Sequence, residues 1–370
     1  MKNILILGGS YAGISTAHRI LKSKTGLEPF KITLVSPNTH FYWNIASPRG
    51  IIPGQLTDEQ LFQPIANGFD HYSTGNFEFI QGSADSMDLE GQNMVIDSSG
   101  GKMILHYDFL IVATGTRMRE MVPFKGIGST EQTKELLHDF QKKVQNAKTI
   151  VVAGAGVTGV EIAGELSYEY GGEKQITLLS STSTIIHEAP PSVSNLATTA
   201  LKDLQVSITY NTKVLKSSLL PKGGQELMLS SGETILADLY IPTFGLLPNS
   251  SYIPAHFLNA TGFVTVDENL NIKGTTNVWA LGDVADVEYC QFASCNRQSI
   301  HVAKSIVAAL NGRTTAPYKA TTTRFMGFQI GKKSGTGHYG NWRLPSFVVV
   351  WVRRNLFLHI FGPIVDGSWF

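Results

Sequence analysis

The chain begins with a short apolar run that leads directly into a glycine-rich turn. Residues 4–7 are apolar, residues 8–13 hold the turn, and residues 14–21 carry apolar positions at helical spacing. Further apolar runs follow at 31–35 and at 109–113, and the latter ends in Thr-Gly-Thr. A strand, a turn, a helix and a second strand in this order predict a βαβ unit of a parallel sheet.

The same order of elements recurs in the middle of the chain. Residues 149–153 form an apolar run, 154–159 a second glycine-rich turn, 160–168 a helix, 175–179 a strand and 240–244 a last strand ending at a glycine. We interpret the repetition as an internal duplication. The predicted fold class is α/β, with two Rossmann-like dinucleotide-binding domains.

After the second unit the pattern returns to the first. A strand is predicted over 276–283 and a helix over about 297–310, and a separate helix over 136–146 leads into the second unit. The predicted division of the chain is a discontinuous first domain, a second domain and a small C-terminal segment, covering 1–116 with 246–316, then 117–245, and then 317–370.

The first turn has the spacing of a pyrophosphate-binding loop, with Gly8 and Gly13 at its ends and Ser10 in place of the middle glycine. Glycines permit the tight turn, and the helix N-terminus offers free N–H groups to a phosphate. An acid that holds the ribose is expected at the end of the next strand. Ser36 occupies that position, and its hydroxyl can still bind a ribose.

The second turn matches the pattern fully, with Gly154, Gly156 and Gly159 between a strand and a helix. The next strand ends at Ser180, so it too lacks the acid that would select NADH. No arginine that would favour NADPH follows it either. We expect NADPH to be tolerated, and the sequence does not rank the two nucleotides. A plain glycine-rich loop is the alternative for each turn.

A third element is Gly282-Asp283, which follows a predicted buried strand. An acid in this place can bind sugar or ribityl hydroxyls of a cofactor that lies across the domain. The same dipeptide is also common in ordinary turns.

Taken together, these motifs resemble the flavoproteins of the glutathione reductase fold, in particular the apoptosis-inducing-factor-like, ferroptosis-suppressor type of NAD(P)H:quinone oxidoreductase and its fungal relatives. The likeness covers nearly the whole chain. The segments that carry it are Gly8 to Gly13, His40 to Asn44 and on through Arg49, Ala113 to Gly115, Gly154 to Glu161, Gly245 to Asn249, and Leu281 to Asp283.

The resemblance implies FAD as cofactor and NADH or NADPH as co-substrate. The implied FAD residues are Gly8, Gly9, Ser10, Tyr11, Ala12, Gly13, Ser36, Asn44, Arg49, Ala84, Ala113, Thr114, Gly115 and Asp283. The implied NAD(P)H residues are Gly154, Gly156, Val157, Thr158, Gly159, Ser180 and Gly245. Glu161 either faces the nicotinamide or pairs with a nearby cation. The helix starting near Asn296 resembles one whose N-terminus points at the flavin.

Disulfide reductases of this fold carry a redox cysteine pair just after the first βαβ unit or inside the second domain. This chain has no cysteine at 35–54 or 150–245. Its two cysteines, Cys290 and Cys295, have a C-x₄-C spacing after Asp283. They are either a thiol pair near the flavin or two small residues in a loop. No metal-ligand constellation is recognisable.

Composition adds two points. The net charge is +1, which does not indicate a nucleic-acid partner, and two cysteines fit a reducing, cytoplasmic compartment. Residues 331–370 combine a net charge of +4 with many aromatic residues, and neither apolar run there, 347–352 or 356–361, has the length of a spanning helix. This segment is either a peripheral membrane surface that admits a lipid-soluble quinone, or core and homodimer interface.

The leading hypothesis is a flavoenzyme that passes electrons from NAD(P)H to a quinone or similar small acceptor. Two alternatives remain open. One is a flavoenzyme of the same fold that acts on a biosynthetic intermediate. The other is a signalling flavoprotein that senses NAD(P)H by forming a long-lived complex and changing its assembly state.

Overall fold

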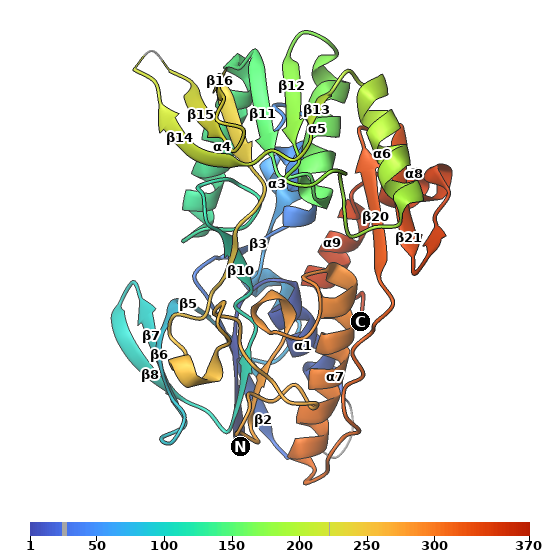
Figure 1. Ribbon diagram of the computed structural model, residues 1–370. Helices are drawn as coiled ribbons and strands as arrows, with labels where there is room; N and C mark the ends of the chain where they lie inside the picture. Colours follow the sequence, from blue (N-terminus) through green and yellow to red (C-terminus); the bar gives the residue numbers. More distant parts are fainter. Residues whose placement is uncertain (24–27, 222) are drawn as a thin grey trace.

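The computed structural model describes residues 1–370 except 24–27 and 222. Two parallel sheets form the two large units, and the C-terminal segment lies along one side of both (Figure 1). The first unit holds the blue N-terminal strands together with the orange helix α7, so segments far apart in the sequence share one fold (Figure 1).

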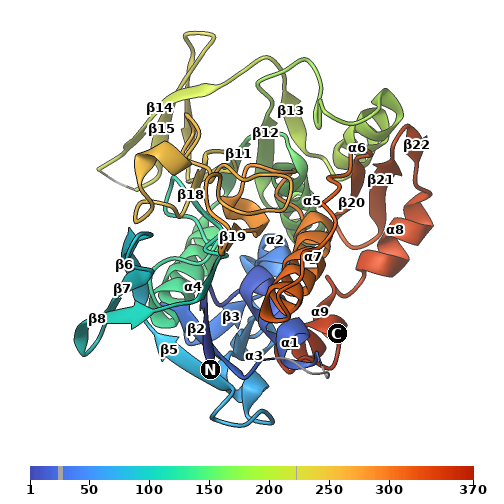
Figure 2. The ribbon, with the colours of Figure 1, turned by 90° about the horizontal axis from the view of Figure 1, so that it is seen from below.

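The first sheet has the order β19-β9-β1-β2-β5 and is parallel throughout. Its strands are β1 (Lys2–Leu7), β2 (Phe30–Ser36), β5 (Phe77–Gln81), β9 (Phe109–Val112) and β19 (Val278–Ala280). Its central strands are apolar because both faces are covered. Helices α1 (Tyr11–Leu21) and α7 (Phe292–Leu310) pack side by side on one face (Figure 2).

An antiparallel meander covers the other face of this sheet. It consists of β6 (Ser83–Asp88), β7 (Asn93–Ser98) and β8 (Gly101–His106). Met94 and Ile96 of the meander join one apolar cluster with Leu5 and Leu7 of β1. The sheet is thus a middle layer, and its carboxyl edge is left open for a ligand.

The second sheet has the order β13-β12-β11-β17 and is also parallel. Its strands are β11 (Thr149–Ala153), β12 (Gln175–Leu179), β13 (Ser207–Thr209) and β17 (Leu239–Pro242), with a meander of β14 (Val214–Leu219), β15 (Gln225–Leu229) and β16 (Thr234–Ala237). The helices of this unit are α4 (Thr130–Asn146), α5 (Val157–Tyr170) and α6 (Pro191–Asp203).

The two units repeat the same hydrogen bonds around their glycine turns. The N–H of Gly8 donates to Val35 at the end of β2, and the N–H of Gly154 donates to Leu179 at the end of β12. The two N–O distances are 2.8 and 3.0 Å. The duplication read from the sequence is therefore present in the backbone.

Two antiparallel strands carry the chain between the units. β10 (Thr116–Met118) leads out of the first unit and β18 (Leu246–Pro248) leads back, and they pair with each other. Both crossings therefore lie side by side at one place.

The C-terminal segment touches both units. Its sheet of β20 (Phe325–Ile330), β21 (Ser334–Tyr339) and β22 (Trp342–Arg343) packs on α5 and α6, and α8 (Ser346–Arg353) packs on that sheet. Helix α9 (Leu358–Val365) packs on α1 and on β4 (Phe62–Pro64) of the first unit, where β4 pairs with β3 (His40–Tyr42).

Short helices complete the first unit, namely α2 (Ser47–Gly50) and α3 (Asp58–Leu61), with 3-10 turns at Asn44–Ala46, Ala66–Phe69, Ala255–Phe257 and Gly282–Val284. Between α8 and α9 the backbone turns sharply through Leu356 and Phe357, with φ of 49° and 59°. Left-handed backbone costs about 1 kcal/mol or more at each non-glycine residue. Packing must hold this break in place.

Several element boundaries differ from those expected, most of them by one to three residues, and three of them bear on the site. Helix α4 begins at Thr130 and not at Leu136, because Ser129 and Gln132 cap its start reciprocally. Helix α7 begins at Phe292 and not near Asn296, although no side chain caps it. The strand expected over 276–283 ends at Ala280.

Candidate functional site

A cavity of about 720 Å³ lies at the carboxyl edge of the first sheet. It is bounded by the turn after β1, the ends of β2 and β9, and the start of α7. Of the predicted FAD residues it is lined by Gly8, Gly9, Ser10, Tyr11, Ala12, Ser36, Asn44, Ala84, Ala113, Thr114, Gly115 and Asp283. Gly13 and Arg49 are not part of the lining.

Close contacts explain why this turn is built of glycine. Gly8 has a φ of 121°, and a Cβ there would lie 2.2 Å from the carbonyl oxygen of Ala113. A Cβ on Gly9 would lie 2.7 Å from that of Ser36, and a Cβ on Gly13 would lie 1.9 Å from the carbonyl oxygen of Gly8. The turn is therefore pressed between β2 and β9. Gly13 does not line the cavity, but it lets α1 pack closely against the backbone of Gly8.

The turn fits a pyrophosphate. Helix α1 begins right behind it, with the extended Ser10 as N-cap, no side chain bonded to the free N–H groups and no acid in the first turn. Free N–H groups and the positive end of the helix dipole favour an anion at this place. Ser10 is exposed, so the side chain that replaces the middle glycine points away from the crowded contacts.

Asp283 lies in the turn after the edge strand β19 and lines the same cavity. Its carboxylate pairs with the ammonium of Lys125 at 2.7 Å, and Lys125 also lines the cavity. Burial opposes the charged form of Lys125, but the charge and hydrogen bond of Asp283 outweigh burial and raise the pKa of Lys125. The sequence reading missed Lys125, which belongs to no motif.

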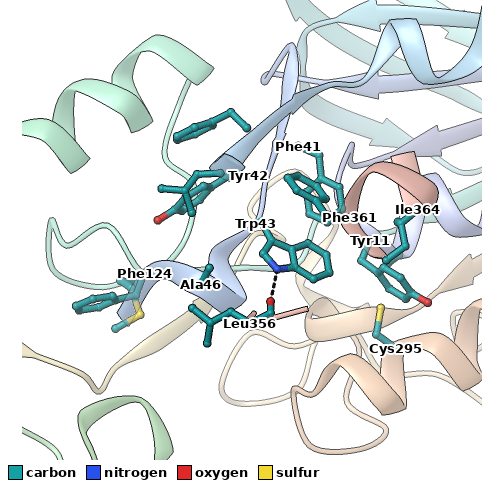
Figure 3. Packing of buried hydrophobic residues seen from close by; sticks show 14 of the residues in the cluster. Tyr11, Phe41, Tyr42, Trp43, Ala46, Phe124, Cys295, Leu356, Phe361 and Ile364 are labelled. Carbon is teal, nitrogen blue, oxygen red and sulfur yellow. Dashed lines mark hydrogen bonds between the residues drawn. The ribbon is translucent and has the colours of Figure 1, made fainter. Parts of the chain in front are cut away.

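An aromatic wall separates the cavity from the C-terminal segment. The indole of Trp43, which lines the cavity, stacks on Phe361 of α9 with ring centroids 4.8 Å apart (Figure 3). Its Nε1–H donates to the carbonyl oxygen of Leu356 at 2.8 Å. Phe41 meets Phe361 edge-on at 5.1 Å. The break between α8 and α9 is thus held against this cavity by a buried indole.

The second turn repeats the geometry of the first. Gly154 has a φ of 107°, and a Cβ there would lie 2.6 Å from Oγ1 of Thr243. A Cβ on Gly159 would lie 1.8 Å from the carbonyl oxygen of Gly154, whereas one on Gly156 would meet nothing within 4 Å. Gly156 is the N-cap of α5 and faces open space. This arrangement also fits a phosphate.

The first turn of α5, which includes Val157 and Thr158, contains no acid. Ser180 follows β12 as directly as Ser36 ends β2, and its hydroxyl donates to the carbonyl oxygen of Thr184 at 2.8 Å. The matching strand ends therefore both carry serine. Gly245 lies at the crossing between the units, where its carbonyl accepts from Arg119 N at 2.9 Å.

Two buried glutamates of α5 pair with arginines, of which Arg49 is buried and Arg353 is half-buried. Glu161 binds Arg353 of α8, and Glu165 binds Arg49 of α2 through two bonds of 2.6 and 3.0 Å. Burial raises the pKa of Glu161 in spite of Arg353. Of the two roles considered for Glu161, the pairing with a nearby cation is the one that the structure displays. Arg49 lines a second cavity of about 680 Å³ beside α9.

Both cysteines are free, and both line the cavity of the first unit. Cys290 is exposed and Cys295 is buried. Within the described part of the chain, no group of three His, Cys, Asp or Glu side chains is arranged to hold a metal ion.

A cavity with a phosphate-binding turn in the first unit and a second such turn in the other unit define a two-dinucleotide oxidoreductase. The chain belongs to the pyridine nucleotide-disulphide oxidoreductase family, whose profile matches residues 2–306. It is an oxidoreductase that uses FAD and NAD(P)H, as this family does.

Relatives span the whole chain. It is 50% identical to "Oxidoreductase ptaL" of Pestalotiopsis fici, with 100% of both chains covered. It is 27% identical to human "Ferroptosis suppressor protein 1" over 96% of this chain and 94% of that protein. The sulfide:quinone oxidoreductase of Aquifex aeolicus has the same fold, with a TM-score of 0.80, 17% identity, and 99% and 92% of the two chains covered.

Proposed function

We propose that this protein is an FAD-dependent NAD(P)H dehydrogenase of the apoptosis-inducing-factor-like, ferroptosis-suppressor type, which reduces a quinone or similar apolar acceptor. The observation that carries the proposal is an exposed aromatic and basic surface on the C-terminal segment, which also supplies Phe361 to the aromatic wall of the cavity. We propose the division of the chain given by its two repeats, with FAD in 1–116 and 246–316, NAD(P)H in 117–245, and acceptor access through 317–370.

The proposed cofactor contacts follow from the two turns. The N–H groups behind Ser10 would hold the FAD pyrophosphate, Ser36 and Ala84 would border the adenosine, and Asp283 would face the ribityl chain. When bound, FAD takes a hydride from NAD(P)H and passes the electrons on. Arg49 lies outside this cavity, so its proposed role is to anchor α5 through Glu165.

The second turn would hold NAD(P)H. The open space at Gly156 would take its pyrophosphate, and Ser180 would face its ribose. A serine neither repels nor pairs with a 2′-phosphate, so both nucleotides would be accepted. Glu161 would act as a positioning residue, because its bond to Arg353 fixes the helix behind the turn.

Six aromatic side chains of the C-terminal segment are exposed, and three of them are exposed most of all. Trp342, Phe347 and Trp351 are 81%, 75% and 67% exposed, and we call them the aromatic surface. Arg343 and Arg354 are exposed beside them. Aromatic side chains with neighbouring cations suit the boundary of a bilayer with anionic lipid.

This surface would dip into a membrane without crossing it. Among the described residues no single helix is long and apolar enough to span a bilayer, and only α8 and α9 together, bent by 44°, pass by length and composition. Ile360, Phe361 and Ile364 of α9 are buried against the protein, so only α8 would enter the lipid. We propose a cytoplasmic protein that is peripheral on a membrane. A homodimer formed through the aromatic surface is the competing proposal.

The C-terminal segment connects this surface with the cavity of the first unit. Helix α8 runs into the break at Leu356, and that break touches Trp43 of the aromatic wall. Trp43 and Phe361 are 1% and 2% exposed, so a quinone head group arriving along α8 would have to displace this packing to reach the cavity. This continuity favours an apolar acceptor.

The test compares a soluble short-chain quinone with a long-chain quinone embedded in phosphatidylcholine/phosphatidylserine vesicles. Phe347→Ser and Trp351→Ser should each lower turnover of the embedded quinone by about tenfold, because each loses more than roughly 1.4 kcal/mol of apolar burial. Turnover of the soluble quinone should stay unchanged. Leu219→Ser, at an equally exposed position on β14 (83% exposed), is the matched control.

Each other outcome identifies an alternative. If turnover of both quinones falls equally, the proposal that this surface binds a membrane is wrong. If NAD(P)H bleaches the flavin but no quinone is turned over, the proposal of a quinone acceptor is wrong, and a biosynthetic intermediate is favoured as substrate. If the reduced flavin is reoxidised slowly and NAD(P)H changes the size of the assembly, the signalling role is favoured. If the protein is a dimer that Trp351→Ser dissociates, the aromatic surface is a homodimer interface.

A further inference from the structure

The turn that carries Asp283 depends on one buried glutamine. It begins at Gly282, whose φ of 74° is left-handed. The N–H of Gly282 donates to Oε1 of Gln298 at 2.7 Å. Gln298 lies in α7 and is buried, but it is not part of the cavity lining. Its side chain therefore ties the backbone just before Asp283 to helix α7 from outside the cavity.

Gln298 is held in its turn by a carboxylate with little exposure to solvent. Its Nε2 donates to Oε2 of Glu288, in the loop before α7, at 3.1 Å. Glu288 also accepts hydrogen bonds from the Arg297 guanidinium, the Tyr318 hydroxyl and the Thr321 N–H. Burial opposes the charged form of Glu288, but these hydrogen bonds outweigh burial and lower its pKa. The side chain of Glu288 is therefore charged at neutral pH and can only accept.

The two contacts of Gln298 admit few other side chains. One end of its amide accepts from the Gly282 N–H, and the other end donates to the Glu288 carboxylate. A primary amide does both. An ionised carboxyl at this position could only accept, and it would face Glu288 as a like charge. An apolar side chain would leave the buried N–H of Gly282 without its acceptor.

The same turn supplies a side chain to the cofactor cavity. The Asp283 carboxylate pairs with the ammonium of Lys125 at 2.7 Å, and both residues line the cavity. A Cβ on Gly282 would lie 3.2 Å from Cβ of Ala12, so the turn packs closely on the first glycine turn. A shift of the backbone at Gly282 would therefore move Asp283 and disturb the phosphate-binding turn as well.

We propose that Gln298 is a positioning residue for FAD, which holds the turn of Asp283 and does not touch the cofactor itself. Glu288 acts one step further back, because it fixes the orientation of the Gln298 amide. Tyr318 and Thr321 belong to the C-terminal segment, so the hydrogen bonds run from that segment to the cofactor turn. The inference rests on the proposed function in one respect, the place of Asp283 at the ribityl chain.

A double-mutant cycle tests whether Gln298 acts through Asp283. The holoenzyme is diluted, and the fluorescence of the released flavin gives the dissociation constant of FAD. Gln298→Met should raise this constant about tenfold or more, because a buried N–H loses its acceptor. In Asp283→Ala the further change Gln298→Met should have an effect of about threefold or less, since both residues act on one contact. If the two effects multiply, Gln298 supports the fold in general and the proposal is wrong.

A pH profile separates positioning from general damage. Gln298→Glu keeps the shape of the side chain, and only its protonated carboxyl can both accept from Gly282 and donate to Glu288. The FAD dissociation constant of Gln298→Glu, divided by that of wild type, should be near one at pH 5.5 and about tenfold higher at pH 8.5. The ratio removes the titration of Glu288 and its partners Arg297 and Tyr318. For Gln298→Met the ratio should be the same at both pH values. A flat profile in Gln298→Glu would overturn the role of the amide.

Ser305→Ala is the matched control. Ser305 is also a buried polar residue of α7, but its hydroxyl bonds to Thr315 at 2.9 Å, so this variant should release FAD as wild type does. If Gln298→Met does not fold, the pH profile of Gln298→Glu decides alone. The readout is FAD binding and does not depend on the acceptor. If no quinone is turned over but the cycle shows coupling, the proposed function fails and the inference stands. If quinone is turned over but Gln298→Met holds FAD as tightly as wild type, the inference alone fails.

Discussion

Acidification should loosen the C-terminal segment through one buried histidine. His18 of α1 is fully buried, and its ring stacks on Phe69 with centroids 4.0 Å apart. Its Nε2–H donates to the carbonyl oxygen of Val365 in α9 at 2.8 Å, and Nδ1 lies 3.1 Å from the hydroxyl of Tyr72. The carbonyl fixes the neutral tautomer, so Nδ1 accepts from the Tyr72 hydroxyl. Protonation of Nδ1 removes this acceptor and places a charge in a buried site, whereas undocking of α9 returns the ring to water.

The size of the effect follows from the pKa. Burial lowers the pKa of His18 from 6.5 to about 4, with Lys22 and His71 acting in the same direction and Asp366 and the bond to Val365 opposing them. A ring released from this site binds protons more strongly than the docked ring. The stability is therefore complete above pH 6.5 and is lost as the pH falls from 6.5 toward 4. One pKa unit is worth about 1.36 kcal/mol, so the loss is roughly 2 kcal/mol at pH 5.

Hydrogen exchange of the α9 amides measures this loss locally. Protection, corrected for the intrinsic exchange rate, should fall about 30-fold between pH 7.5 and pH 5, since each 1.4 kcal/mol is a factor of ten. In His18→Gln the protection should change little between the two values. The exposed His106→Gln is the control and should behave as wild type. Equal protection of α9 at both pH values in wild type, or an equal fall in His18→Gln, would refute the reasoning.

Three further substitutions test the site. Gly8→Ala should weaken FAD binding by at least about 100-fold, because its Cβ would lie 2.2 Å from the carbonyl oxygen of Ala113 and its φ is left-handed; flavin release on dilution measures this. Arg49→Met should lower the free energy of unfolding by about 3–5 kcal/mol, since Glu165 is left buried and unpaired, and Glu165→Gln in the same chain should recover part of the loss in a denaturant titration. Ser180→Asp should raise the ratio of kcat/KM for NADH over NADPH by about tenfold or more, because a carboxylate would face the 2′-phosphate.

Controls separate these effects from general damage. Gly327→Ala places a Cβ in open space and should leave FAD binding unchanged. Retained flavin in Gly8→Ala would show that the turn is not the FAD site. An unfolding free energy unchanged in Arg49→Met would mean that the buried pair contributes nothing, and an unchanged nucleotide ratio in Ser180→Asp would remove this position from the ribose site.

The parts of the fold that follow from local chemistry could be read from the sequence. The limits of β11 and β12 match the expectation, because apolar runs between glycine turns leave little choice of boundary. The start of α4 was predicted wrongly at Leu136, although Ser129 and Gln132 have the spacing of the capping box that marks it. The start of α7 could not be read, because no capping side chain marks it.

Contacts between distant residues carried no local signal. Arg49 and Glu165 are 116 positions apart, and their pairing depends on how α2 of one unit meets α5 of the other. Lys125 meets Asp283 across 158 positions from a loop without a motif. The sequence therefore indicated the glycine turns, and the ion pairs that arrange the units around them required the fold.

The C-terminal segment spans the joint between the two units. Its strands rest on α5, the helix behind the second glycine turn, while α9 rests on α1, the helix behind the first. By contacting both helices, the segment fixes the orientation of the proposed NAD(P)H unit relative to the proposed FAD unit before either ligand binds. The same stretch also carries the proposed surface for the acceptor. A substitution in this segment that favours a new acceptor would therefore also change how NAD(P)H is placed against the flavin. Selection on reoxidation of the flavin by the acceptor will then constrain its reduction by NAD(P)H.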